Sequence, residues 1–286
     1  MKKIDLIVII PVGPTTNIDF LLDTIESVKY YCGKSQKIIL TNDSRKEINL
    51  DQKLNLDVVN MPSPMGKQSG LYFSLCSGIK HAIEKYDFKV LLRMDDDALV
   101  TGKEPEIEAM EYFNNHPEVG ILGSYKVDWE NTKRSFLPPK KQIQIELNPL
   151  WRIYNFFRKR KTNSIEPAVK LAVKHGYELG EHILGGVYFM SRTLIDKLNT
   201  AGQMPSQHFV GSKLEEDHIF GILTYSVNMR LGDFVTANYP MCLKWKGMPT
   251  SPQNVLKIGK KVVHSTRYYL DLPEKEVRAI FKKSRK

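Results

Sequence analysis

The feature that most constrains the fold is an alternation of short apolar runs with amphipathic stretches through the first hundred residues. The apolar runs lie at residues 4–12, 36–43, 56–61 and 88–94. The amphipathic stretches at 17–31 and 66–86 have helical periodicity, and Asn17 is suited to cap the first of them. Strands that alternate with helices at this spacing predict an α/β fold with a mostly parallel sheet and helices on both faces.

The second half of the chain is less regular. We expect a helix at 106–116, a strand at 119–125, a strand leading into a helix across 182–200, and a helix within 213–229. From about residue 126 to 181 the pattern loosens, which indicates an irregular insertion of helices and loops. Because no linker or repeat interrupts the chain, we predict a single domain over residues 1–286 that ends in a basic tail at 271–286.

Composition argues against several classes of protein. The 286 residues carry a formal net charge of +10, and 42% of them are hydrophobic, which is enough for a sizeable core. The longest apolar run near the start, "LIVII", is far shorter than the roughly 20 residues of a membrane span. Asp5 interrupts a start that otherwise looks like a signal peptide. Three widely spaced cysteines form neither a disulfide framework nor a zinc motif, which favours a reducing cytoplasm.

Three adjacent acids, Asp95, Asp96 and Asp97, follow the predicted strand "FKVLLRM", and the apolar "ALV" comes directly after them. In an open α/β sheet, ligands bind beyond the carboxyl ends of the strands, which is also where Asp43 lies. Adjacent carboxylates raise one another's pKa and are destabilising unless solvent or a cation relieves them. A solvated acidic turn is the simplest alternative, but the apolar residues on both sides favour a site for a hard divalent cation.

A second acidic group, Glu215, Glu216 and Asp217, opens the last of these predicted helices. The helix macrodipole favours negative charge in a first turn, and this alone could explain the group. Two observations favour a site instead. The helix continues as the strongly apolar "IFGIL", and the adjacent pair Gly185 and Gly186 allows the backbone to approach a ligand closely. None of the seven histidines stands out by its local pattern.

Taken in order, these motifs resemble those of the GT-A-fold (Rossmann-like) nucleotide-sugar glycosyltransferases. The resemblance extends from Ile4 to about Arg267 and rests on "IVIIPVGP", "LTNDS", "LLRMDDDALV", "LGGVYFMSR", "EED" and a late "HSTR". The chain is most similar to the large inverting, family 2-like group that makes bacterial polysaccharides, and "MDDDALV" and "EED" also resemble animal beta-1,3-galactosyltransferases. Two motifs depart from the family pattern, because Asn42 stands where an aspartate is usual and "SLCSG" stands at 74–78.

The resemblance implies a mixed, mostly parallel sheet and a role for each motif. The end of the first strand and the acid after the second would hold the nucleotide, which assigns Pro11, Val12 and Asp43. Further donor-binding residues would be Gly70, Arg93, Asp95, Asp96, Gly185 and Gly186. The metal ligands would be Asp97, Asp95 and His264, with Asp97 the most direct. The catalytic base would be Asp217, with Glu216 as the alternative.

The resemblance also implies a cofactor and partners. The expected cofactor is Mn²⁺ or Mg²⁺, and the expected donor is a nucleotide-diphosphate sugar, with UDP favoured. Residues 1–100 would form the donor-binding half and residues 101–270 the acceptor-binding half. The acceptor would be a hydroxyl of a glycan or of a lipid-linked molecule, which attacks directly and inverts the anomeric carbon. We expect no nucleic acid partner, because no DNA- or RNA-binding signature accompanies the positive charge.

A basic aromatic segment, "NPLWRIYNFFRKRK" at 148–161, lies outside these motifs. Three interpretations are open: a helix packed on the body with a solvated basic end, a peripheral contact with an anionic membrane at its cytoplasmic face, or a contact with an acceptor glycan or a partner. Two alternatives to the transferase are also open. One is a sugar-phosphate nucleotidyltransferase, although "PVGPTTN" lacks the basic residue of its phosphate loop, and the other is a non-catalytic nucleotide- or glycan-binding relative.

Overall fold

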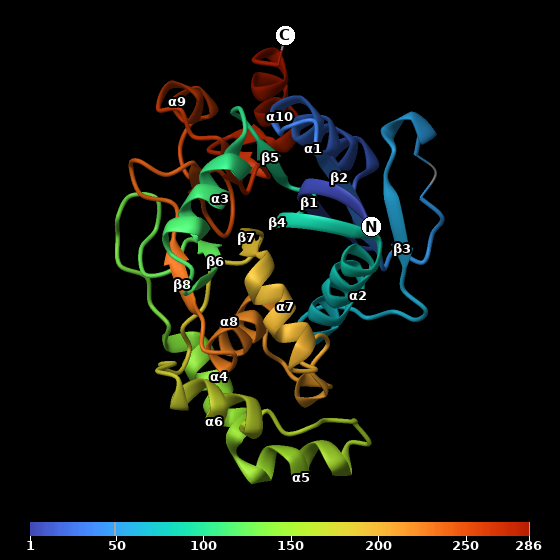
Figure 1. The fold of residues 1–286 in the computed structure, drawn as a ribbon, viewed down its shortest axis with the longest axis vertical. Coiled ribbons are helices and arrows are strands. Elements are labelled where there is room, and N and C mark those ends of the chain that lie inside the picture. Colours follow the sequence, from blue (N-terminus) through green and yellow to red (C-terminus); the bar gives the residue numbers. More distant parts are fainter. Residues whose placement is uncertain (49, 286) are drawn as a thin grey trace.

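A computed structural model of the chain describes residues 1–48 and 50–285. Asn49 and Lys286, the last residue of the predicted basic tail, lie outside the described residues. The main feature is a seven-stranded sheet in the order β3-β2-β1-β4-β7-β6-β8 (Figure 1). Its strands are β1 (Lys2–Val12), β2 (Gln36–Asn42), β3 (Asp57–Asn60), β4 (Tyr86–Met94), β6 (Val119–Gly123), β7 (Val187–Ser191) and β8 (Arg230–Asp233).

The sheet is mixed and mostly parallel. β1 pairs in parallel with β2 and β4, β2 with β3, and β6 with β8. The exception is β7, which runs antiparallel to both of its neighbours, β4 and β6. β7, which follows Gly185 and Gly186, therefore begins next to the end of β4, which leads into the acid triplet. This arrangement confirms the predicted α/β fold class.

Helices cover both faces of the sheet (Figure 1). One face packs against α1 (Ile18–Tyr31) and α3 (Pro105–Asn115), and the other against α2 (Ser69–Lys85), α7 (Arg192–Thr200) and α8 (Glu216–Ser226). Asn17 caps α1, as predicted, because its side-chain oxygen accepts hydrogen bonds from the first-turn amides.

The alternation of side chains along β1 explains its apolar sequence. Leu6, Val8 and Ile10 belong to the core beneath α1 and α3, whereas Ile7 and Ile9 belong to the core on the α2 side. A strand buried on both faces needs apolar residues at every position. The run "IDLIVIIPV" therefore marks a central strand.

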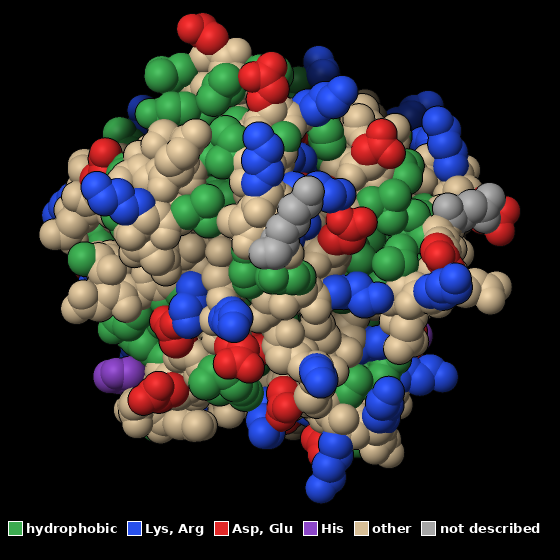
Figure 2. All heavy atoms as spheres, turned by 90° about the horizontal axis from the view of Figure 1, so that it is seen from above, with side chains coloured by type: hydrophobic (Ala, Val, Ile, Leu, Met, Phe, Trp, Pro, Cys, Tyr) green, Lys and Arg blue, Asp and Glu red, His purple; other side chains and the backbone are tan. Residues whose placement is uncertain are grey.

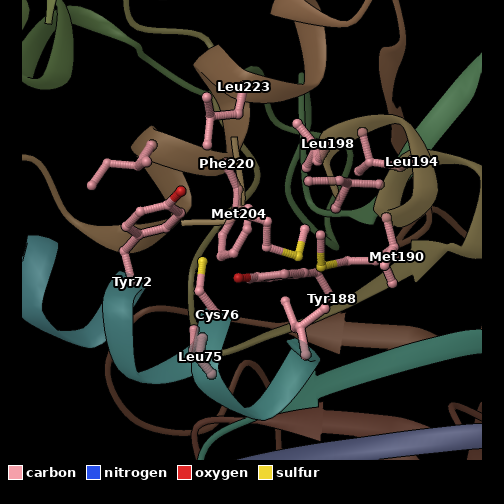
Figure 3. Packing of buried hydrophobic residues seen from close by; sticks show 14 of the residues in the cluster. Tyr72, Leu75, Cys76, Tyr188, Met190, Leu194, Leu198, Met204, Phe220 and Leu223 are labelled. Carbon is pink, nitrogen blue, oxygen red and sulfur yellow. The ribbon is translucent and has the colours of Figure 1, made fainter. Parts of the chain in front are cut away.

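The core between the sheet and α2, α7 and α8 is rich in aromatic and sulfur-containing side chains (Figure 3). Tyr72 of α2 packs edge-on against Phe220 of α8, with 5.2 Å between ring centroids. The Tyr72 hydroxyl donates to the carbonyl of Gln203 and accepts from the amide of Ser206, both at 2.8 Å. This packing fixes α8, whose first turn carries the second acidic group.

A second, three-stranded sheet brings the end of the chain to the acid triplet. It consists of β5 (Ala98–Val100), β10 (Val262–His264) and β9 (Met241–Leu243), with β10 in the middle. β10 runs antiparallel to β5, and their register sets His264 opposite Ala98. Because Ala98 follows Asp97 directly, this register places His264 beside the acids.

Residues 126–181, predicted to be an irregular insertion, contain three helices and their connecting loops. The helices are α4 (Leu137–Leu147), α5 (Pro149–Phe157) and α6 (Glu166–Lys174). α6 packs against α8, whereas α5 lies at the opposite end of the molecule from the C-terminus (Figure 1). Short 3₁₀ helices, η1 (Gln52–Leu54) and η2 (Gln207–Phe209), interrupt two other loops. Within the described part of the chain, no helix has the length and apolar character to cross a bilayer.

The C-terminal residues form part of the packed domain. After α9 (Pro252–Lys257), the hairpin of β11 (Tyr268–Tyr269) and β12 (Leu272–Pro273) leads into α10 (Glu274–Lys283). Arg278 of α10 is 4% exposed, and its Nη1 lies 3.0 Å from the carboxylate of Asp23 in α1. Its Nη2 donates to the carbonyl of Asp96 at 2.5 Å. The helix that begins within the predicted basic tail thus supports the acidic loop.

Figure 2 views the molecule from the side of α1 and α10. Lys and Arg side chains are scattered over this face among acidic and apolar ones. A nucleic-acid-binding surface typically gathers its cations in a patch or stripe, and this face has no such arrangement among the described residues.

The contacts of α10 predict that two of its cations, Arg278 and Lys282, contribute very differently to the free energy of unfolding. Arg278→Ala removes one of two cations from the buried Asp23, which keeps Arg285, and a donor from the Asp96 carbonyl. It is expected to lower the free energy of unfolding by about 3 kcal/mol. Lys282→Ala removes an exposed pair with Glu26 and is expected to cost less than about 1 kcal/mol. Urea denaturation of both variants checks this. Equal losses would mean that the buried pair contributes no more than the exposed one.

Candidate active site

The backbone of the acid triplet is held on two sides. The amide of Asp95 donates to the carbonyl of Gly186 at 2.8 Å, which joins the end of β4 to the start of β7. The hydroxyl of Thr24 in α1 donates to the carbonyls of Asp96 and Ala98 at 2.8 and 2.9 Å. These contacts fix the backbone of the triplet, and each of its three carboxylates has a different environment.

Asp95, Asp97 and His264 converge, and we call them the carboxylate–imidazole cluster. One ligand atom from each lies within 4.8 Å of the others. The Nε2 atom of His264 is 3.3 Å from Asp97 Oδ1 and 3.8 Å from Asp95 Oδ2. Its Nδ1 atom lies 2.9 Å from the carbonyl of Lys244, so Nδ1 donates there and Nε2 is the nitrogen that faces the carboxylates.

The environment of Asp97 fits a metal ligand. Its Oδ2 accepts hydrogen bonds from the hydroxyl of Ser265 at 2.8 Å and from Nε of Arg267 at 2.7 Å. Its Oδ1 is buried and accepts no hydrogen bond, so it is available to a cation. Burial would raise the pKa of Asp97, but His264 and Arg267 together hold it well below its usual range. Two carboxylates and one imidazole form a donor set that could hold a divalent metal ion.

Asp96 does not join the cluster. Burial, together with the charges of Asp95 and Asp97, raises its pKa to about 6, although a hydrogen bond from Thr16 opposes this. Its backbone carbonyl accepts from both Thr24 and Arg278. The structure therefore gives Asp96 a position beside the cluster, facing α1 and α10.

Arg93 connects the two acidic groups. Its guanidinium is buried, and its Nη2 lies 2.8 Å from Asp95 Oδ1 and 3.0 Å from Glu216 Oε1. Burial alone would lower the pKa of Arg93, but these two carboxylates raise it, so the side chain stays charged. The resemblance assigned Arg93 to donor binding. In the structure Arg93 is buried beneath the site, where its positive charge balances the negative charges of Asp95 and Glu216.

Glu216 and Asp217 are adjacent but differ in charge state. Burial, reinforced by the charges of Asp217 and Asp95, raises the pKa of Glu216 to about 8, although the charge of Arg93 opposes this shift. Burial would also raise the pKa of Asp217, but the charge of His218 and the backbone amide of His218 lower it. These shifts favour the ionised form of Asp217 and the neutral form of Glu216.

Hydrogen bonds orient the Asp217 carboxylate. Its Oδ2 accepts from the amide of Gly185 and its Oδ1 from the amide of His218, both at 2.8 Å. His182, His218 and Asp217 also lie close enough to share a metal ion. However, Nε2 of His182 accepts from Arg134 at 2.9 Å and Nδ1 contacts the Gly180 carbonyl. With both nitrogens occupied, His182 is a positioning residue, and burial lowers its pKa to about 4.

The absence of side chains at Gly185 and Gly186 allows Asp217 and His264 to lie close to the start of β7. A Cβ atom at Gly185 would lie 2.9 Å from Asp217 Oδ2, and one at Gly186 would lie 2.4 Å from the His264 ring. Gly186 also has a φ of +98°, which side chains rarely tolerate. The sequence predicted a close approach to a ligand here, and the structure puts two site side chains in that space.

The remaining predicted donor residues form a separate group at the carboxyl ends of β1 and β2. Pro11 and Val12 pair with the last residues of β2. The Asp43 carboxylate accepts from the amides of Met65 and Gly66, at 2.9 and 2.8 Å. A Cβ atom at Gly70 would lie 1.7 Å from the Met65 carbonyl oxygen. Asp43 and Gly70 therefore shape the loop before α2.

Local sequence patterns did not identify several supporting residues. Ser265 and Arg267 hold Asp97, and Arg134 and His182 lie behind Asp217. The run "HSTR" at 264–267 was a usable signal for the first pair, because consecutive polar residues follow a buried strand. Arg134 lies in the irregular insertion, where no pattern distinguishes it.

Comparison with known proteins gives limited information. No protein-family model and no curated protein matches the chain. Among solved structures it is similar to S. aureus TarS, with 14% identity over 89% of this chain and 38% of that one and a TM-score of 0.43. It is also similar to the mannosyltransferase PcManGT from Pyrobaculum calidifontis, solved with GDP-Man and Mn²⁺, with 12% identity, 81% and 55% coverage, and a TM-score of 0.43. The chain spans less than two thirds of either protein, so we derive its function from the site.

The contact between Gly186 and His264 predicts a specific effect on metal binding. Gly186→Ala places a methyl group against the imidazole and is expected to weaken Mn²⁺ binding at least about tenfold. Gly202→Ala is the matched control, because Gly202 also has a positive φ but faces open space. Mn²⁺ titration followed by electron paramagnetic resonance measures both. Unchanged affinity in Gly186→Ala, with the fold retained by circular dichroism, would exclude His264 as a ligand.

Proposed function

We propose that this chain is a metal-dependent, inverting glycosyltransferase. It transfers a hexose from a nucleotide-diphosphate sugar, with UDP favoured, to a hydroxyl of a glycan or lipid-linked acceptor in polysaccharide or glycoconjugate synthesis. The observation that supports this best is the convergence of Asp95, Asp97 and His264 within 4.8 Å, next to a buried and ionised Asp217. The first group can hold a divalent cation, and Asp217 can accept a proton. Sugar transfer from a diphosphate to a hydroxyl benefits from both.

The chemistry of the leaving group explains the need for positive charge. As the bond to the anomeric carbon breaks, negative charge develops on the diphosphate. A Mn²⁺ or Mg²⁺ ion bound by Asp95, Asp97 and His264 would neutralise that charge. Arg93 and Arg267 orient the cluster, because each pairs with one of its carboxylates.

Asp217 is the group that we assign to the acceptor. An attacking hydroxyl loses its proton during transfer, and an ionised carboxylate within reach can take it. The amides of Gly185 and His218 hold this carboxylate in one orientation. Attack from the face opposite the diphosphate inverts the anomeric carbon, through a transition state with oxocarbenium character.

The donor would lie over the carboxyl ends of β1, β2 and β4. Pro11 and Val12 would contact the nucleotide, whereas Asp43 acts indirectly because its carboxylate already binds the loop at residues 65–66. Residues 1–100 would thus bind the donor and residues 101–270 the acceptor.

The three cysteines are free and buried, which agrees with the expected cytoplasmic location.

A panel of nucleotide-sugars with Mn²⁺ or Mg²⁺ tests the activity. We expect nucleotide release from at least one donor, inverted product by NMR, and loss of turnover in chelator and in Asp97→Asn. Retained configuration would overturn the role of Asp217. Pyrophosphate release from a nucleoside triphosphate and a sugar phosphate would instead identify a nucleotidyltransferase. Binding of nucleotide-sugar without turnover of any donor would identify a non-catalytic relative.

The different environments of the two neighbouring acids predict different effects of amide substitution. Asp217→Asn is expected to lower kcat by about 10²–10⁴-fold, because the base is lost while the donor contacts remain. Glu216→Gln keeps the shape of a side chain already poised to be neutral, so kcat is expected to stay within about tenfold. Kinetics, with nucleotide affinity from calorimetry as the control, separates them. The reverse order would make Glu216 the base.

A further inference from the structure

Helix α5 presents an apolar face to solvent. Leu150, Ile153, Tyr154 and Phe157 occupy positions i, i+3, i+4 and i+7, and they are 67%, 51%, 48% and 78% exposed. This spacing places the four side chains on one side of the helix, which is the side that a surface helix normally buries. Phe156, at its edge, is 77% exposed.

The side of α5 that faces the protein carries Asn155 and the partly buried Trp151. Asn155 is 1% exposed, and its side-chain amide donates to the carbonyl of Trp151. α5 packs against α4, at the end of the molecule farthest from the C-terminus (Figure 1). Most of the apolar side chains of α5 that the structure describes therefore lie away from the packed body.

Four cations follow the apolar face directly. Arg158, Lys159, Arg160 and Lys161 are all exposed, and no acidic residue occurs between Leu147 and Ile165. Among the described residues no ion pair involves any of the four. The guanidinium of Arg158 lies over the ring of Tyr154, 4.8 Å from its centroid, so charge and aromatic surface adjoin.

We propose that the basic aromatic segment, residues 148–161, is an interfacial anchor that docks the protein on an anionic lipid surface. The apolar face of α5 would enter the boundary between headgroups and acyl chains, and the four cations would pair with anionic headgroups. Phe, Tyr and Leu with adjoining Lys and Arg match the composition of such anchors. A purely anionic partner, such as a nucleic acid, would leave the aliphatic side chains without a role.

The anchor is connected rigidly to the acids of α8. Just before it, Glu146 of α4 accepts hydrogen bonds from the hydroxyl of Ser212 and the amide of Lys213, at 2.7 and 2.8 Å. Just after it, Asn163 donates from its backbone to the carbonyl of Val210 and from its side chain to that of Gln207. The segment is thus fixed at both ends to the loop that leads to Glu215.

This connection has a consequence for the acceptor, which rests on the proposed function. A protein docked through α5 would hold Asp217 in a constant orientation to the lipid surface. An acceptor presented by a lipid fits that arrangement better than a free glycan does. Lipid binding itself needs no donor or metal, so it is tested separately from activity.

The test uses the whole 286-residue chain and vesicle sedimentation. We expect binding to vesicles of phosphatidylglycerol and phosphatidylcholine at low salt, and little binding to phosphatidylcholine alone. Binding should weaken in about 1 M salt, where the Debye length falls to about 3 Å. Asp97→Asn should bind vesicles like the wild type, which separates a failure of docking from a failure of the proposed activity. Absence of binding to the anionic vesicles at low salt would overturn the proposal.

Two double variants test the two parts of the anchor. Phe156→Ser with Phe157→Ser is expected to reduce vesicle affinity at least about tenfold, through lost apolar burial. Lys159→Glu with Arg160→Glu is expected to reduce it by about 100-fold or more. All four side chains are exposed, so the fold should be retained.

Matched control variants change exposed charge or exposed apolar surface outside the anchor. Lys140→Glu with Lys141→Glu alters exposed charges on α4, and Leu270→Ser removes an exposed apolar side chain far along the chain. Neither should change vesicle affinity more than about twofold, since each lies outside the anchor.

If charge reversal abolishes binding while the phenylalanine pair has no effect, the surface binds anions without lipid insertion. If α5 instead mediates self-association, seen by ultracentrifugation and lost in the phenylalanine variant without any vesicle binding, the face is a protein interface. Either result would overturn the proposal.

Discussion

The site depends on one buried cation, the guanidinium of Arg93. It pairs with Asp95 in the loop after β4 and with Glu216 at the start of α8. Without it, these carboxylates and Asp217 would repel one another in a region that largely excludes water. Because a buried charge left without its partner is far more costly than an exposed one, Arg93 holds two distant segments of the chain in one site.

The antiparallel direction of β7 decides what can surround that cation. It brings the glycine pair to the end of β4, where a larger residue would collide with Asp217 or His264. The small sheet completes the arrangement, because the pairing of β10 with β5 delivers His264 from near the end of the chain. Asp217 and the carboxylate–imidazole cluster therefore adjoin at two backbone positions where a Cβ atom would collide with Asp217 or His264.

The insertion at residues 126–181 links the site to the exposed helix α5. Its α4 and the residues after α5 hold the loop that leads into α8, while the apolar face of α5 points outward. Hydrophobic residues arranged in a helical stripe normally contribute to the core. Here they lie largely outside the core, and their arrangement fits the lipid-facing role that we propose for α5.

Local patterns in the sequence determined the elements and their order, because burial on one face or two imposes its own periodicity on each strand and helix. The run of β1, the cap at Asn17 and the strand-end position of the acid triplet were all predictable in this way. The resemblance of "HSTR" to a family motif singled out His264, which no local pattern distinguished from the other histidines. Only the tertiary structure decided which carboxylates share Arg93 and that Asp43 binds a loop. Those contacts join residues far apart in the chain, and they depend on strand register and burial, which no local periodicity encodes.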